Sequence, residues 1–260
     1  MKESLEKAKD IVKRSGNNFH CKVVNYLREA NWTVLISPYY NDNILDKPRE
    51  IDLIAEKPFD VFCGNFGNIK GTINIKLFIE CKYVNNEIVF WFDQKDRQKA
   101  EEILTTYTPL RPDNSYTQKH HYLTHNQVGK LFDTGSKKQP ENDFFFKAIN
   151  QSLNALIYYR NSTSIIPNSN KVCPNILTSI NYPIILFNTF NKVFHLDMAG
   201  QKDLSIVEDN FQVEVNYAYL NQSKNSVNEY FLIDIVDFNR FDNFFSIIKA
   251  DNDAISVLLD

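Results

Sequence analysis

The sequence predicts an α/β (α+β) sandwich, in which helices flank a mixed central sheet that C-terminal antiparallel strands extend. Helical periodicity opens the chain, β-rich segments follow, and helical periodicity returns before a closely spaced series of strands. Because the strands beyond residue 180 follow one another so closely, we expect them to extend the same sheet. We therefore expect a single domain over residues 1–260, with a core at about 15–200 and a C-terminal extension at about 201–260.

The N-terminal third predicts a helical region and three strands. Apolar spacing indicates helix over residues 4–30, interrupted near 15–18, with Asn17 or Asn18 capping the second part. Its stripe of Phe19, Val23 and Leu27 is expected to face the sheet. Segments 32–40, 50–56 and 73–84 are rich in β-forming residues and predict strands, with Pro58 and residues 64–71 making a turn region.

The remaining chain predicts alternating elements with one unassigned stretch. The expected elements are a strand at 87–92, helices at 93–105 (capped by Asp93) and 143–159, a strand pair at 183–187 and 192–196, strands at 213–220 and 230–236, and a closing helix at 241–248. Residues 106–142 are polar and give no assignment.

Composition excludes several classes of protein. The net charge of −3 is not the strongly basic balance typical of nucleic-acid binding, although a local basic strip is compatible with it. No apolar run is long enough to span a membrane, and the N-terminus has no signal region, so we expect a cytoplasmic protein. The four cysteines are far apart, which indicates neither a zinc ribbon nor a disulfide framework. The seven glycines form no phosphate-binding motif.

Three charged residues lie on segments that are otherwise apolar. Glu80 and Lys82 alternate with apolar neighbours on one predicted strand, so their side chains point to the same face. Asp52 lies in the preceding strand, between Ile51 and Leu53. Because adjacent strands are about 4.8 Å apart, Asp52 and Glu80 can meet across one strand spacing.

Two carboxylates this close repel each other unless a cation lies between them. The hard cation Mg²⁺, or Mn²⁺ in its place, takes oxygen ligands, and we expect it at Asp52, Glu80 and the backbone carbonyl of Cys81. Such an ion acidifies a bound water and neutralises charge on a phosphate. Lys82 would orient that water or stabilise the developing negative charge.

The segments at residues 49–54 (REIDLI) and 78–83 (FIECKY) resemble the PD-(D/E)xK nuclease superfamily, which includes restriction endonucleases and junction resolvases. The similarity covers roughly residues 15–90, and a helix at 143–160 fits it. The resemblance implies a restriction-endonuclease-like fold, Asp52 and Glu80 as metal ligands, and Lys82 as the catalytic lysine. It also implies DNA as the substrate and a setting in restriction or phage defence.

The resemblance adds two residues to the expected site. Members often carry a glutamate on the first helix, where this chain has His20. His20 is compatible with a metal or water contact, with loss of that contact, or with an ordinary polar position on a helix face. The proline that usually precedes the first aspartate is absent. Many members place a glutamine on the later helix, and Gln151 is the candidate here. Because such enzymes often need two sites to cut both strands, a homodimer is expected.

Several alternatives stay open. The three charged residues are also compatible with a solvated cross-strand salt-bridge cluster. A catalytically idle nuclease-like module that binds nucleic acid or protein is the second interpretation. A zinc-dependent hydrolase that uses His121 and His125, at i and i+4, is a distant third.

Other residues have weaker functional interpretations. Glu50 is expected at the surface, with a possible role at a second metal. Trp91 is compatible with base stacking but more typical of a core. Several cations could form a DNA-facing strip or simply a solvated surface: Lys95, Arg97, Lys99, Lys119, Lys130, Lys137 and Lys138.

Overall fold

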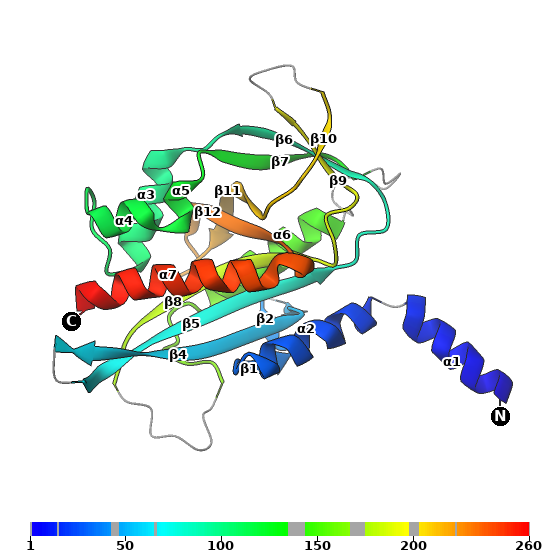
Figure 1. Ribbon diagram of the computed structural model, residues 1–260, viewed down its shortest axis with the longest axis horizontal. Coiled ribbons are helices and arrows are strands. Elements are labelled where there is room, and N and C mark those ends of the chain that lie inside the picture. Colours follow the sequence, from blue (N-terminus) through cyan, green and yellow to red (C-terminus); the bar gives the residue numbers. More distant parts are fainter. Residues whose placement is uncertain are drawn as a thin grey trace.

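The computed structural model describes residues 2–14, 16–42, 47–64, 67–134, 144–166, 175–197, 203–221 and 223–259. Within these ranges the chain forms a mixed ten-stranded sheet in the order β1-β4-β5-β8-β12-β11-β7-β6-β9-β10, and a small sheet of β2 and β3. The protein is therefore an α/β fold with one large mixed sheet flanked by helices, as the sequence predicts (Figure 1).

The strands of the large sheet are β1 (Thr33–Ile36), β4 (Leu53–Cys63), β5 (Asn68–Lys82), β6 (Ile88–Gln94), β7 (Gln127–Asp133), β8 (Ile176–Phe187), β9 (Val193–Asp197), β10 (Ser205–Ile206), β11 (Phe211–Leu220) and β12 (Ser226–Asp237). The small sheet pairs β2 (Tyr39–Asn41) with β3 (Pro48–Glu50). The helices are α1 (Lys2–Arg14), α2 (Asn17–Glu29), α3 (Arg97–Tyr107), α4 (Ser115–Lys119), α5 (His121–Thr124), α6 (Phe144–Tyr159) and α7 (Phe241–Leu259), and a 3₁₀ turn spans Phe238–Arg240.

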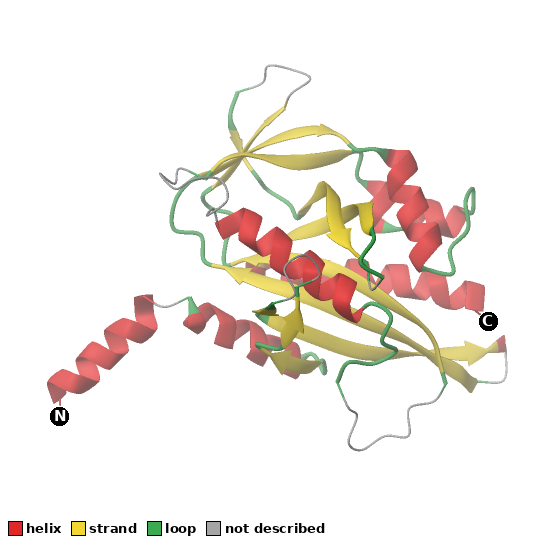
Figure 2. Cartoon of the chain, turned by 180° about the vertical axis from the view of Figure 1, so that it is seen from behind, coloured by secondary structure: helices red, strands yellow, loops and turns green. Residues whose placement is uncertain are grey.

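Helices cover both faces of the large sheet. One core unites α2, α3, α5 and α7 with one face, and the predicted stripe of Phe19, Val23 and Leu27 is buried in it. A second core packs α6 against the other face (Figure 2). Strand β5 is buried at every position from 71 to 80, because both of its faces are covered.

Two features of the N-terminal strands differ from the sequence prediction. The expected strand at 32–40 is split, because Ser37 adopts a left-handed φ of 50° and Pro38 follows it. Its two halves, β1 and β2, enter different sheets. The expected turn at Pro58 is wrong, since Pro58 lies inside β4. Strand β1 pairs with β4 only as far as Glu56, so β4 has one neighbour at Pro58 and tolerates a missing N–H there.

The helix caps also differ from the predictions. The N-cap position of α2 is Gly16, which has no side chain to accept a capping hydrogen bond. Neither Asn17 nor Asn18 is therefore the capping residue. Helix α3 begins at Arg97 rather than at 93, because strand β6 continues to Gln94 and Asp96 accepts the capping hydrogen bond from the Lys99 amide.

The C-terminal half corrects the predicted strand pairing. Strands β8 and β9 do not pair with each other: β8 runs parallel to β5 and β12, whereas β9 runs parallel to β6. Strands β11 and β12 form the expected antiparallel pair, but they lie in the interior of the sheet rather than at its edge. The unassigned stretch from 106 contains α4, α5 and β7, and α7 continues eleven residues beyond the expected end at 248, to Leu259. None of the described helices has the length and apolarity needed to cross a membrane.

Candidate active site

The structure brings Asp52 and Glu80 together where β4 begins and β5 ends. The antiparallel register pairs Leu53 with Ile79, so Asp52, one residue before β4, faces Glu80. Residues 78 and 80 share a strand face, and Phe78 packs on the α6 side of the sheet. The sequence prediction that Asp52 and Glu80 meet across one strand spacing is confirmed.

Each carboxylate binds the backbone of the other strand. Asp52 Oδ2 accepts a hydrogen bond from the Cys81 amide at 2.8 Å, and Glu80 Oε1 lies 3.2 Å from the Asp52 amide nitrogen, which donates to it. Lys82 Nζ donates to the second oxygen, Glu80 Oε2, at 2.7 Å. These contacts hold the three side chains in one group and confirm that Glu80 and Lys82 point the same way.

Burial sets the electrostatics of this group. Glu80 is fully buried, which raises its pKa to about 7, with Lys82 opposing the shift and Asp52 adding to it. Burial also acts to lower the pKa of Lys82, but the negative charges of Glu80 and Asp52 outweigh it and the pKa of Lys82 is raised. Lys82 is therefore a firmly held ammonium beside a carboxyl group that resists ionisation.

His20 and Gln151 reach this region from opposite faces of the sheet. His20 Nε2, on α2, lies 3.1 Å from the carbonyl oxygen of Asp52. Gln151 Nε2, on α6, donates to the carbonyl oxygen of Glu50 at 2.8 Å. Both side chains thus contact the backbone that carries Asp52 rather than its carboxylate, and this arrangement fixes the position of the Asp52 peptide.

The donors available to a cation at this site are oxygens. Asp52 and His20 are half-buried, and the Lys82 side chain is 18% exposed, so the group reaches solvent on one side. The Cys81 thiol is not suited to bind metal, because burial raises its pKa well above its ordinary value. A pair of carboxylates with one open side fits a hard divalent cation, and the Cys81 carbonyl stays a predicted third ligand.

The weaker functional predictions have different outcomes. His121 and His125 do not form a pair, because His121 is buried and His125 is exposed. Lys95 is not part of a surface strip, since its Nζ donates to the Tyr122 carbonyl and to Gln212 Oε1. The other described members of the proposed strip are Arg97, Lys99, Lys119 and Lys130, whereas Lys137 and Lys138 lie outside the described residues.

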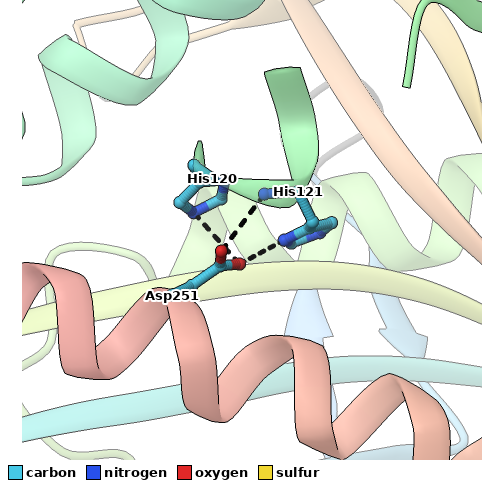
Figure 3. Close-up of side chains that lie close together, drawn as sticks. All are labelled: His120, His121 and Asp251. Carbon is cyan, nitrogen blue, oxygen red and sulfur yellow. Dashed lines mark hydrogen bonds and ion pairs between the residues drawn. The ribbon is translucent and has the colours of Figure 1, made fainter. Parts of the chain in front are cut away.

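Sequence reasoning missed a second polar cluster, in which His120 and His121 meet Asp251 of α7 (Figure 3). Atoms able to bind a metal lie within 4.8 Å of one another in this trio. The adjacent histidines were the available signal. Their aspartate lies 130 positions from His121, and its position on α7 follows no local pattern that could have revealed the contact.

The main cavity lies away from the carboxylate pair, whereas a small cavity is lined by His120 of the second cluster, together with Tyr122 and Tyr182. A cavity of about 870 Å³ lies beside β6, β7 and β11, and Asp52, Glu80 and Lys82 are not among its lining residues. The candidate active site is defined by its chemistry instead: two carboxyl groups and a lysine gathered at the end of β5.

No protein-family model matches this chain, and no curated protein or solved structure matches it either. The resemblance to a nuclease superfamily therefore depends on the residues of the candidate site and on the order of the elements around them.

Proposed function

We propose that the chain is a metal-dependent nuclease of the PD-(D/E)xK type that hydrolyses phosphodiester bonds in DNA. One observation carries the proposal: Asp52 and Glu80 face each other on adjacent strands, with Lys82 Nζ 2.7 Å from Glu80. Their order along the chain, with α2 before them and α6 after them, agrees with the resemblance. DNA as the substrate, and restriction or phage defence as the setting, follow from that resemblance alone.

The chain's own residues have distinct roles in this proposal. Asp52 and Glu80 supply the oxygens that hold Mg²⁺ or Mn²⁺, which when bound makes a water more acidic and screens the charge of a phosphate. Lys82 holds its proton beside the reacting phosphate and stabilises negative charge there. His20 and Gln151 position the Asp52 peptide through its neighbouring carbonyls.

The idle-module alternative is favoured by one specific observation. Glu80 is fully buried, and its two oxygens already accept hydrogen bonds from the Asp52 amide and Lys82. A group whose hydrogen bonds are already satisfied in this way is also the arrangement of a structural ion pair. In that case the module would bind its partner through another surface, and divalent cations would not change it.

The direct test incubates the full chain with plasmid, linear and single-stranded DNA in Mg²⁺, Mn²⁺ or EDTA. We expect cleavage with either ion and none in EDTA. The variant Asp52→Asn should lose both metal binding and cleavage, because it removes a charged ligand. The matched control is Asp60→Asn, an exposed carboxylate on the same strand, which should cleave like the wild type.

Failure has a clear signature in this experiment. Absence of cleavage for every DNA form with both ions, together with no calorimetric binding of Mn²⁺, would reject the nuclease and favour the idle module. Cleavage by wild type and Asp52→Asn at equal rates would instead point to another site or a contaminant.

A further inference from the structure

A buried cluster of four side chains connects α5, α7 and β12. His120 and His121 belong to the start of α5, Asp251 to α7 and Asp234 to β12. All four side chains are at most 6% exposed. Ionisable groups buried this deeply must pair their hydrogen-bond donors, acceptors and charges with one another. The hydrogen bonds therefore determine the protonation state of each group.

His121 has a carboxylate at each ring nitrogen. Its Nδ1 contacts Asp251 Oδ2, and its Nε2 lies 3.3 Å from Asp234 Oδ2. The Asp251 carboxylate also accepts a hydrogen bond from the His121 amide at 3.1 Å. Because an ionised carboxylate can only accept, both ring nitrogens of His121 must donate, and the ring is an imidazolium.

His120 is fixed in the opposite state. Its Nδ1 accepts a hydrogen bond from the Tyr122 amide at 3.2 Å, so that nitrogen carries no proton. Its Nε2, 3.4 Å from Asp251 Oδ2 and 3.4 Å from the Tyr182 hydroxyl, is then the protonated nitrogen of a neutral ring. Burial lowers the pKa of His120 to about 3, which agrees with this state.

The charges of the cluster then balance. Asp234 and Asp251 are negative, His121 is positive, and Lys95 supplies the second positive charge. Lys95 reaches the cluster through Gln212, whose Oε1 accepts from Nζ at 2.6 Å and whose Nε2 donates to Asp234 Oδ1 at 3.0 Å. A cluster that is neutral as a whole has no need of another cation.

The same contacts argue against a metal ion between His120, His121 and Asp251. A neutral histidine that binds metal through Nε2 must carry its proton on Nδ1. In His120 that nitrogen faces the Tyr122 N–H, and two donors would then oppose each other. A divalent ion would also add charge to a cluster that is already balanced.

We propose that His121 is a constitutively charged imidazolium that fastens α7 and α5 to the sheet through Asp251 and Asp234, and that a proton rather than a metal ion occupies this centre. The four residues act as a latch. This latch holds the segment between β6 and β7, which contains α3, α4 and α5, against the C-terminal helix α7. Loss of the proton of His121 would break the connection.

The groups that face His121 support a strongly retained proton. Burial acts to lower the pKa of His121, but Asp234 and Asp251 outweigh it and raise the pKa to about 10. The other titratable neighbours are His120 and Tyr122 on α5, Tyr182 on β8, Lys95 before α3, and His125. Burial lowers the pKa of Lys95 to about 8, so as the pH rises Lys95 loses its proton before His121 does.

The decisive experiment is ¹⁵N NMR of the histidine ring nitrogens in the full chain at pH 7.5, combined with metal analysis. We expect His121 with both nitrogens protonated, His120 neutral with its proton on Nε2, and less than about a tenth of an equivalent of zinc. His125 provides a contrast within the same spectrum, because burial, Lys95 and His121 lower its pKa and it should be neutral at this pH. A neutral His121 at this pH, or one equivalent of zinc bound through His121, would overturn the proposal.

The fastening role has a separate test by hydrogen–deuterium exchange. In His121→Gln we expect residues 251–259 of α7 to lose protection by about tenfold or more relative to the wild type, with β5 little changed. The matched control, His125→Gln, should leave α7 unchanged. Equal protection of α7 in wild type and His121→Gln would refute the latch, and if that variant does not fold, the NMR result on the wild type decides.

Discussion

The two polar clusters of this protein use similar residues in opposite ways. At the end of β5, Asp52, Glu80 and Lys82 have two carboxyl groups for one cation, and one side reaches solvent. Around α5, two aspartates are matched by His121 and Lys95, and every member is buried. The open cluster therefore lacks positive charge that a ligand can supply, whereas the closed cluster is complete.

This difference separates a candidate site from a structural network. An unbalanced pair of carboxylates is stabilised by an arriving cation, so its state depends on a ligand. A buried network whose charges balance is not stabilised by an added ion, and it is strongly destabilised if one member is removed. Helix α7 joins the two regions, because its first turns pack Phe241 and Phe245 on Tyr26 of α2, the helix that carries His20.

The largest expected effect is on stability, in the closed cluster. His121→Gln leaves two buried aspartates without their shared cation, and we expect a loss of about 3–5 kcal/mol in the free energy of unfolding. Urea denaturation at pH 7 measures it, with His125→Gln as the control. A loss no greater than that of the control would show that the cluster does not stabilise the fold.

The next effect is on catalysis, in the open cluster. Lys82→Ala should keep fold and metal binding but slow single-turnover DNA cleavage about 100-fold or more, because it removes a stabilising charge. Lys82→Arg should not restore full activity, since the planar guanidinium of arginine differs in shape from the compact ammonium of lysine. Lys70→Ala, at the exposed start of β5, is the control. Equal rates for wild type and Lys82→Ala would remove Lys82 from the mechanism.

A smaller effect is expected from the two helices that hold the Asp52 peptide. His20→Ala and Gln151→Ala each remove one hydrogen bond worth about 1 kcal/mol, so we expect roughly five- to tenfold slower cleavage with little change in the substrate KM. Cys21→Ala and Asn150→Ala alter exposed neighbours on the same helices and should have no effect. A loss of metal affinity in His20→Ala would instead make His20 a ligand.

The last expected effect is the pH dependence of stability. The pKa of His121 is raised from 6.5 to about 10, so its contribution is complete below pH 6.5 and declines as the pH rises toward 10. Lys95 has a lowered pKa of about 8 and acts in the opposite direction above that value. We therefore expect the stability advantage of wild type over His121→Gln to fall between pH 6.5 and 8. A constant difference over that interval would contradict the raised pKa of His121.

The elements around the candidate site follow from local patterns in the sequence. The helical stripe of α2 and the long buried strand β5 are periodic features, and side-chain alternation alone places Glu80 and Lys82 on one face. The pairing of Asp52 with Glu80 was also predictable, because consecutive antiparallel strands need only a turn between them. The positions of His20 and Gln151 near Asp52 came from the resemblance, and the structure adds that both bind backbone carbonyls.

Other features were decided only by tertiary structure. The split at Ser37 depends on a left-handed backbone conformation, and the separation of β8 from β9 depends on which distant strands pair with each. Lys95 looks like an ordinary solvated lysine in the sequence, yet it is buried because Gln212 and the Tyr122 carbonyl accept its hydrogen bonds.

The closed cluster shows this limit most clearly. The sequence by itself determined two adjacent histidines and many separate aspartates, each with an ordinary solvent-exposed interpretation. His121 meets partners 113 and 130 positions away, and no local period relates residues at such separations. Only the packing of β12 and α7 against α5 removes these groups from water, and that removal is what forces them to share protons and charge.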